Sequence, residues 1–513
     1  MDTNGEGMIN QNLKLIAKSS IIVFIGLVFS KLFLYIYRIL IARYYSPKVY
    51  GLFALGVMVF GWFRVFSGLG FRQGLLRYIS IFRGKKQEEK IPSLVKKSIM
   101  ILFFTGVLAG TLLFISAEFI ALKIFSSPDL IIFLKIFSCA IPLAIIGESL
   151  LAILRAYEKI GWHSFISNIL GNLLTLGVLM LFLFVGVGII SIPLSYLIGV
   201  FSILIASYFV CRFNLSKIFK KEMKSMKAGS KAFREMFSYS WPFVFYGIVL
   251  LVFSWTDSLM LGIFRTAEEV GFYNAAMPFA ALIEFPLAIF IQLFFPLVTK
   301  EFSKNNLEAV KQLSQQVGKW IFMVVIPIFI LLMIFPGVFL NLFGPEYLVA
   351  ESALRFLSIG ILFSALFGLS HELLLMKGKS KLILFNMLIA GSLNVILNFF
   401  LVPRYGITGA GVATMFSLLL LNALLAIQAY RYLSIIPLRR KTFQIFLIAL
   451  VSTALLLVVK LILPSSFLAL FLGGFFFVAI YLLLILTTRC LDKNDLYILK
   501  VGLGKITKRR NLI

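Results

Sequence analysis

Residues 98–121 read SIMILFFTGVLAGTLLFISAEFIA, an apolar run in which Glu118 is the one ionisable side chain. A helix of about 20 apolar residues is long enough to cross the hydrocarbon core of a bilayer. Runs of this kind recur from near Ser19 to near Leu486, separated by short polar or basic stretches. This pattern predicts a polytopic membrane protein built from helices.

The composition agrees with this interpretation. The chain has 513 residues, of which 61% are hydrophobic and 14% charged. A soluble domain is about half apolar and about one quarter charged. We therefore predict an all-α membrane fold with about 14 transmembrane helices. The expected spans are 19–42, 50–76, 98–121, 130–154, 162–185, 190–211, 239–263, 271–298, 316–338, 352–376, 381–402, 409–431, 443–463 and 467–488.

The ends and the cysteines indicate no processing, disulfide framework or cofactor. Residues 1–12 are polar, and the apolar stretch from Ser19 to Ile41 is too long for the core of a signal peptide. The three cysteines have no disulfide or metal-ligand spacing, and His163 and His371 lack a carboxylate or cysteine cluster. We expect no metal and no cofactor.

Basic residues return at every second loop. The basic set contains 83–86, 155–159, 217–234, 300–311, 377–381, 439–441 and 505–510, and the alternate loops hold few lysines or arginines. By the positive-inside rule, both termini are predicted to be cytoplasmic in a multi-pass cell membrane protein. The formal charge of +28 is then a consequence of topology and of contact with anionic lipid head groups, and indicates no nucleic acid partner.

Three landmarks suggest an internal repeat. Gly51 and Gly271 open spans 2 and 8 at an offset of 220 residues, and Asn168 and Asn386 recur at 218. Gly188-Ile189 and Gly406-Ile407 also lie 218 residues apart. This common register predicts two six-helix lobes of parallel topology with a cleft at their interface, as in other transporters with parallel repeats. The expected domains are a lobe at 1–213, a basic cytoplasmic linker at 214–237, a second lobe at 238–433, and two extra helices with a basic tail at 434–513.

Ionisable side chains inside the predicted spans are candidates for a functional site, because their burial in hydrocarbon is costly without a cavity or partner. The cationic candidates, expected to bind substrate, are Lys31, Arg38, Arg64, Lys135 and Arg355. Lys31, Tyr35 and Arg38 share one helix face, whereas Lys135 and Arg355 lie near a membrane face where long side chains reach the interface at little cost. A cationic wall in the first lobe suits a phosphate or diphosphate head group.

The acidic candidates, expected to couple ions or line the cavity, are Asp257, Glu284 and Glu148. Asp257 has the alternative of a structural pair with an arginine. Asn168, Asn172, Asn386, Asn394 and Asn398 recur at multiples of four on two spans, and we expect hydrogen bonds between helices there. No Walker loop, GxSxG or HExxH motif occurs, which favours a transporter over an enzyme.

Four short motifs, in order along nearly the whole chain, resemble a known family. Residues 38–43 with 50–54 are similar to the junction of spans 1 and 2 in polysaccharide-biosynthesis flippases. Residues 257–262 with 270–276 resemble their junction of spans 7 and 8, and 343–347 and 405–411 resemble two further landmarks. The chain is therefore similar to O-antigen-type flippases of the multidrug/oligosaccharidyl-lipid/polysaccharide exporter superfamily.

The resemblance implies a V of two six-helix lobes around a cationic cavity, with Arg38, Arg64 and Asp257 lining it. It implies a flippase that moves a polyprenyl-(di)phosphate-linked oligosaccharide across the cytoplasmic membrane by alternating access. Glycosyltransferases or a polymerase of the same pathway would be its partners. The alternatives are a cation-coupled multidrug or metabolite exporter, a lipid II flippase, and a membrane scaffold for glycan-assembly enzymes.

Overall fold

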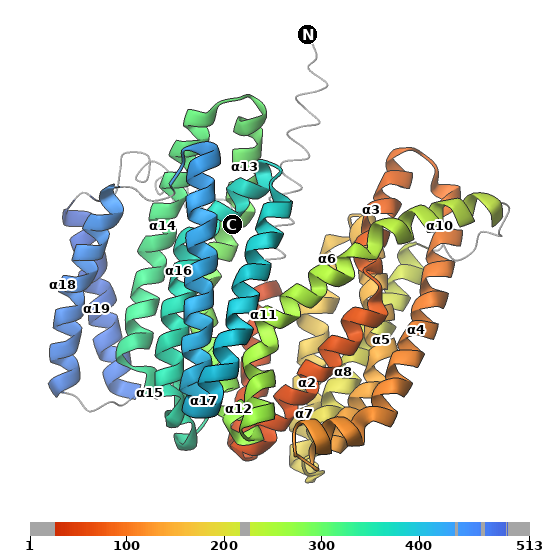
Figure 1. Cartoon of the computed structure of the whole chain (residues 1–513), viewed down its shortest axis with the longest axis horizontal. Helices are drawn as coiled ribbons and strands as arrows, with labels where there is room; N and C mark the ends of the chain where they lie inside the picture. The colour runs from red at the N-terminus through yellow and green to blue at the C-terminus, as the bar shows by residue number, and fades with distance from the viewer. Residues whose placement is uncertain (1–25, 216–225, 437–439, 463–466, 489, 491–513) are drawn as a thin grey trace, which may run out of the picture. The chain divides into compact units, whose positions relative to one another are not determined.

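The computed structural model describes residues 26–215, 226–436, 440–462, 467–488 and 490. Within these ranges the chain forms helices and no strand (Figure 1). A helix at 26–44 comes first. The others, in chain order, are α2 (Pro47–Gly68), α3 (Phe71–Gly84), η1 (Glu88–Lys90), α4 (Ile91–Phe119), η2 (Ile120–Ile124), α5 (Leu130–Ala156), α6 (Ile160–Ser164), η3 (Phe165–Leu170), α7 (Gly171–Val185), α8 (Ser191–Asn214), α10 (Met226–Ser240), α11 (Pro242–Phe264), α12 (Ala267–Ala280), η4 (Ala281–Ile283), α13 (Phe285–Ser303), α14 (Leu307–Ile334), α15 (Pro336–Leu340), η5 (Pro345–Ala350), α16 (Glu351–Met376), α17 (Ser380–Leu433), α18 (Arg440–Ile462) and α19 (Phe467–Thr487).

Eleven helices of the described chain are long and apolar enough to cross a membrane, or twelve if α12 and α13 form one bent span. The predicted class, an all-helical polytopic membrane protein, is confirmed. The count of 14 stays a prediction. One reason is that the expected first span begins among residues 1–25, which lie outside the described residues. Another is that α17 covers both of the stretches predicted as spans 11 and 12.

Two breaks explain where the sequence-based boundaries differ from the helices. The span expected at 50–76 ends at Gly68, because Leu69 and Gly70 both take positive φ angles before α3 begins. Within α17, Gly406 has φ 52° and ψ −132°, which interrupts the helical path. Gly188, its partner in the sequence repeat, also has a positive φ of 78°. Glycine suits these positions because it has no side chain to clash there.

The described chain divides into two compact units. The first comprises residues up to Ala275 with 343–347 and 391–413, and the second comprises 276–342, 348–390 and the chain from Thr414. The lobe boundaries expected from the sequence repeat are not tested by this division and stay a prediction.

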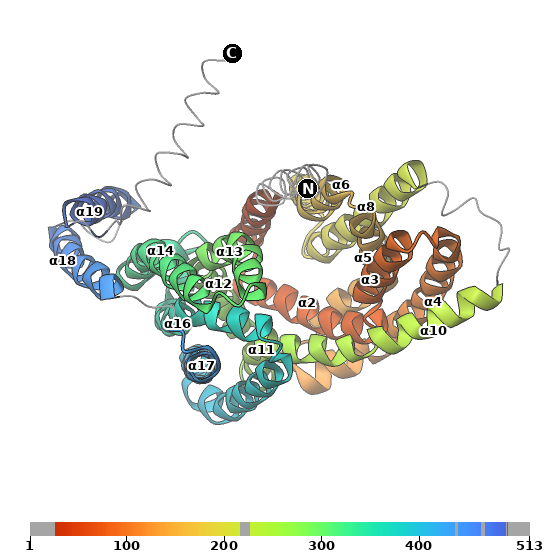
Figure 2. The same ribbon diagram turned by 90° about the horizontal axis from the view of Figure 1, so that it is seen from above.

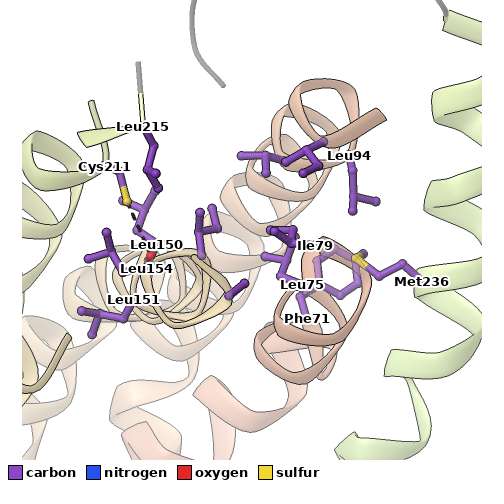
Figure 3. Close-up of a cluster of buried hydrophobic side chains, with 14 of the residues drawn as sticks. Phe71, Leu75, Ile79, Leu94, Leu150, Leu151, Leu154, Cys211, Leu215 and Met236 are labelled. Atoms are coloured by element: carbon purple, nitrogen blue, oxygen red, sulfur yellow. Dashed lines mark hydrogen bonds between the residues drawn. The ribbon is translucent and has the colours of Figure 1, made fainter. Parts of the chain in front are cut away.

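The first unit has a buried apolar core in which α3, α4, α5, α8 and α10 meet. Figure 3 shows Phe71, Leu75 and Ile79 of α3 facing Met236 of α10. On the other side of this core, Leu150 and Leu154 of α5 meet Cys211 of α8. The Sγ of Cys211 donates to the carbonyl of Leu150, 3.6 Å away, and the side chain is fully buried in this core.

The helix α10 falls in the stretch that the sequence indicated as a basic linker. Its apolar positions, Ala232 and Met236, are buried, while Arg234 and Glu235 are exposed. Figure 2 shows α10 running beside α3 and α4, which agrees with the contacts among these helices. The described part of this stretch is therefore a helix with buried apolar positions at 232 and 236 and exposed charged side chains at 234 and 235.

The second unit packs α13, α14, α16, α18 and α19 together. The paired helices α18 and α19 lie side by side in both views (Figures 1 and 2). Phe335, Val338, Leu456 and Phe477 form one buried cluster of this unit. The Nζ of Lys460 donates to the carbonyl of Ile334 at 2.7 Å, which satisfies a backbone acceptor at the end of α14.

Candidate functional site

A cavity of about 320 Å³ lies within the first unit, among α2, α3, α5, α6, η3 and α8. Apolar side chains such as Phe60, Ala144 and Leu151 form part of its wall. The polar and charged side chains on the wall are Arg64, Arg72, Glu148, His163, Ser167, Asn168 and Tyr196. A partly apolar hollow with a few convergent polar groups is the usual form of a ligand site.

Arg64 and Glu148 form an ion pair inside this cavity. The Nη1 of Arg64 donates to Oε1 of Glu148 at 2.7 Å, and the two side chains remain 37% and 32% exposed. The guanidinium carbon also lies 5.8 Å from the centre of the Phe60 ring. Because α2 carries Arg64 and α5 carries Glu148, the pair joins two elements 84 residues apart in sequence. Glu148 thus neutralises much of the positive charge expected from Arg64.

Arg38 approaches the same group of residues from the helix at 26–44. Its charge acts on the phenol groups of Tyr50 and Tyr196, and Tyr196 also experiences the charges of Arg64 and Glu148. Tyr37 fixes the helix, since its hydroxyl donates to the carbonyl of Ile192 on α8 at 3.1 Å. The buried Nε of Arg38 makes no hydrogen bond with any described residue.

The other cationic candidates have different surroundings. Lys31 is exposed on the helix at 26–44 and does not belong to the cavity wall. Lys135 pairs with Glu118 at 2.8 Å, outside the cavity. Arg355, in the second unit, pairs with Glu351 at 3.0 Å and donates from Nε to the carbonyl of Met333. Arg64 thus lies on the cavity wall, the charge of Arg38 acts on Tyr196 of that wall, and Lys135 and Arg355 have local partners.

Asp257 lies on α11 in a buried polar cluster of the first unit. Its side chain is 5% exposed. Tyr273 donates to Oδ2, and Asn398 donates to Oδ1 at 2.7 Å. The Nδ2 of Asn394 lies 3.5 Å from the same Oδ1. Asp257 thus accepts hydrogen bonds from a tyrosine and an asparagine, and the alternative of a structural pair with an arginine stays a prediction.

This cluster is rich in oxygen. The buried Oδ1 of Asn398 accepts no hydrogen bond from any described residue. Carboxylate and amide oxygens together are ligands of the type that hard monovalent and divalent cations prefer. Among the described residues, no group of three or more His, Cys, Asp or Glu side chains is arranged to hold a metal ion.

Glu284, the third acidic candidate, belongs to the second unit. It lies between η4 and α13, where the chain bends by 42°, and its side chain is exposed. Its carbonyl accepts from the backbone of Ala288 at 3.2 Å, at the beginning of α13. The role of Glu284 in ion coupling stays a prediction.

The asparagine ridges make some of the hydrogen bonds between helical segments that their spacing predicts, whereas the described bond of Asn168 goes to Ser164, one turn earlier. Asn172 donates to Ser30 at 2.8 Å within the first unit. In the second unit, Asn386 and Gln428 donate to each other at 2.6 and 3.0 Å. Asn394 and Asn398 serve Asp257 instead, as described above.

Arg72 and Tyr196 are among the cavity residues that the sequence analysis missed. Arg72 lies within the stretch predicted as span 2, and its charge was a signal that went unused. Tyr196 carried no such signal, since a tyrosine in an apolar helix is ordinary. Its role follows only from α8 being placed against α2 and α5.

Comparison with known proteins supports this description. The family model described as polysaccharide biosynthesis protein matches residues 16–302, and the MatE model matches 242–400. An "Uncharacterized membrane protein MJ1068" of Methanocaldococcus jannaschii is 26% identical over 93% of this chain and 95% of that protein. A "Putative O-antigen transporter" of Shigella flexneri is 23% identical over 73% of this chain and 88% of that protein.

Among solved structures, the inward closed conformation of the lipid II flippase MurJ has a TM-score of 0.73 and 16% identity. The match covers 91% of this chain and 99% of the MurJ chain. At 16% identity, this similarity shows the fold alone. The family model, by contrast, matches more than half of the sequence, including the cavity helices and Asp257. The chain is a membrane transporter and not an enzyme, and it belongs to the polysaccharide biosynthesis protein family of flippases in the superfamily named above.

Proposed function

We propose that this protein moves a polyprenyl-(di)phosphate-linked oligosaccharide across the cytoplasmic membrane by alternating access. The observation that carries the proposal is the cavity lined by Arg64 and Arg72, with Arg38 close to it. Membership in the polysaccharide biosynthesis family and similarity to an O-antigen transporter support this class of substrate.

The chemistry of the cavity suits the head group of such a lipid. Each guanidinium presents several N–H donors in a fixed fork, which matches phosphate oxygens better than an ammonium does. The guanidinium of Arg38, whose charge reaches Tyr196 of the cavity wall, would contribute further donors. We assign the diphosphate to Arg64 and Arg38, with Lys31 as a more exposed contact. Lys135 and Arg355 are proposed only as secondary contacts, because both already pair with glutamates.

Asp257 is proposed as the coupling acid. Its carboxylate and the free Oδ1 of Asn398 could bind a sodium ion, or the carboxylate could bind a proton. Ionisable groups inside membrane helices commonly serve ion pathways. Glu148 is proposed as an acid of the cavity, and Glu284 as a second ion-coupling candidate.

The decisive experiment is replacement of Arg64 with Ala, assayed by lipid-linked glycan on the two leaflets of the membrane. Export should fall at least about tenfold while the protein still inserts, because the loss of one charged hydrogen bond costs about 1.5 to 3 kcal/mol. Arg64→Lys should restore only part of the activity. Arg212→Ala is the matched control, since Arg212 is exposed on α8 and contacts Tyr208 instead. Normal export by Arg64→Ala would refute the cationic site.

Two other transport functions are kept as alternatives. The MatE model matches the part of the chain that contains Asp257, which favours a cation-coupled exporter of drugs or metabolites. Such a protein would export small organic cations, and the positive charges near the cavity repel them. A lipid II flippase is the other alternative, favoured by the fold match. These functions are separated by identifying the lipid-linked glycan that accumulates in cells lacking this protein.

A further inference from the structure

The ion pair inside the cavity raises a question of charge balance. If Arg64 binds a phosphate, Glu148 loses its hydrogen bond at 2.7 Å and then lies beside a second anion. Two negative groups a few ångströms apart in a partly apolar cavity repel each other strongly. Glu148 must therefore find another cation, leave the cavity or become neutral.

The groups that face Glu148 limit these choices. From α2 it faces Arg64, from α3 Arg72, from α6 His163 and from α8 Tyr196. The helix α4 also packs on α5 but contributes no side chain to the cavity wall. A diphosphate in this small cavity would compete for Arg72 and His163 as well.

We propose that Glu148 is the resident counter-ion of Arg64, that an incoming diphosphate displaces it, and that its carboxylate then takes up a proton. This inference rests on the proposed function and adds a proton to the substrate-binding step. The proton comes from the buffered solution and converts the carboxylate to the neutral carboxylic acid, while Arg64 keeps its charge and transfers its donors from carboxylate to phosphate. Release of the head group reverses both steps.

The proposed proton uptake makes the affinity for a diphosphate depend on pH. If binding takes up one proton, the affinity for a diphosphate falls by up to about tenfold for each pH unit as pH rises. Acid conditions favour the loaded state and alkaline conditions favour the Arg64–Glu148 pair. The pair also excludes weaker anions, since any ligand must compete with a carboxylate that is already in place.

The test uses the purified full chain and a short-chain prenyl diphosphate that carries one sugar. Each phosphorus of this diester has a single, strongly acidic oxygen, so the charge of the probe is constant between about pH 6 and pH 8. Calorimetry in buffers of different ionisation enthalpy counts the protons taken up on binding. We expect nearly one proton for the wild type and none for Glu148→Gln, which should also bind more tightly at the alkaline end. Glu148→Asp should keep the uptake.

Two further variants sharpen the result. His163→Gln should still show proton uptake, because the proton resides on Glu148. Asp129→Asn is the matched control, since Asp129 forms an exposed ion pair of 2.6 Å with Lys48 outside the cavity. It should behave as the wild type in both affinity and proton count.

Several outcomes would overturn the inference. Binding by the wild type with no proton uptake would refute it and leave the proposed function intact. Uptake that survives in Glu148→Gln but disappears in His163→Gln would assign the proton to the histidine. A wild type that does not bind the probe, together with normal export by Arg64→Ala, would refute the proposed function itself.

Discussion

At the scale of single residues, Asp257 shows how this chain keeps a carboxylate inside an apolar helix. Tyr273 and Asn398 donate to its two oxygens, and Asn398 comes from α17, 141 residues away. Removal of one partner from a buried charged set costs several kcal/mol, because the remaining groups stay buried without their partner. Loss of the Asp257 charge should therefore alter the function of this cluster.

We predict that Asp257→Asn abolishes ion-dependent export, lowering it at least about tenfold. The amide has the shape of the carboxylate but lacks the charge that holds a cation or a proton. Transport in inverted vesicles, measured with and without imposed sodium and proton gradients, checks this.

Asp129→Asn serves again as a control, because it removes an exposed carboxylate of the same unit. If Asp257→Asn responds to both gradients as the wild type does, Asp257 is a structural residue.

The same scale shows what the sequence could provide. Arg64, Glu148 and Asp257 were identifiable because a charge in an apolar span is costly and therefore conspicuous. Their partners were not, since the contact of Arg64 with Glu148 depends on how α2 lies against α5. Lys135 was also identifiable as a charge in an apolar span, but it pairs with Glu118, 17 residues earlier, outside the cavity. The sequence thus yields candidates, and packing decides which of them share a cavity.

At the scale of elements, the first turns of α2 and α12 approach each other at backbone distance. A Cβ on Gly51 would fall on the carbonyl oxygen of Ala267, and one on Gly271 would fall on that of Pro47. Tyr50 adds a hydrogen bond from its hydroxyl to the carbonyl of Asn274 at 3.2 Å. Small residues permit such close approach of helices in membranes. The two glycines that marked the sequence repeat therefore meet each other in the first unit.

We predict that Gly51→Ala destabilises the protein by about 2 kcal/mol or more, since the added methyl group must push two backbones apart. The apparent melting temperature of the purified protein should fall by several degrees.

Gly177→Ala is the matched control. Gly177 also lies inside a helix of the first unit, but nothing lies within 4 Å of a Cβ built there. That variant should be neutral or slightly stabilised, because alanine favours helix over glycine. Equal melting temperatures for the two variants would show that α2 and α12 do not need this contact.

The elements also show where hydropathy loses accuracy. It located the apolar helices well because length and composition dominate that signal. It missed the break at Leu69 and Gly70, since left-handed backbone angles leave no trace in hydropathy. The predicted linker at 214–237 overlaps helix α10, whose apolar positions at 232 and 236 follow helical spacing.

At the scale of the whole molecule, topology connects the site with its function. A flippase must take its substrate from the leaflet where it is made, so the orientation of the helices decides the direction of transport. Alternation of basic loops predicts that 83–86 face the cytoplasm and that 186–188 face outward. These two loops flank elements of the same unit, α3 and α7, and therefore provide a direct comparison.

We predict that Val187→Cys reacts with a membrane-impermeant thiol reagent in intact cells, whereas Lys85→Cys reacts only after permeabilisation. The expectation follows because lysine and arginine are retained on the cytoplasmic side during insertion. Cys139 is exposed and should first be replaced by Ser, while Cys211 and Cys490 are buried and provide little background. An extra cysteine at Lys505 in the tail extends the test to the C-terminus, which should behave as Lys85→Cys does. Labelling of Lys85→Cys but not Val187→Cys in intact cells would invert the orientation, and the head group would then reach Arg64 from the opposite side of the membrane to the one proposed.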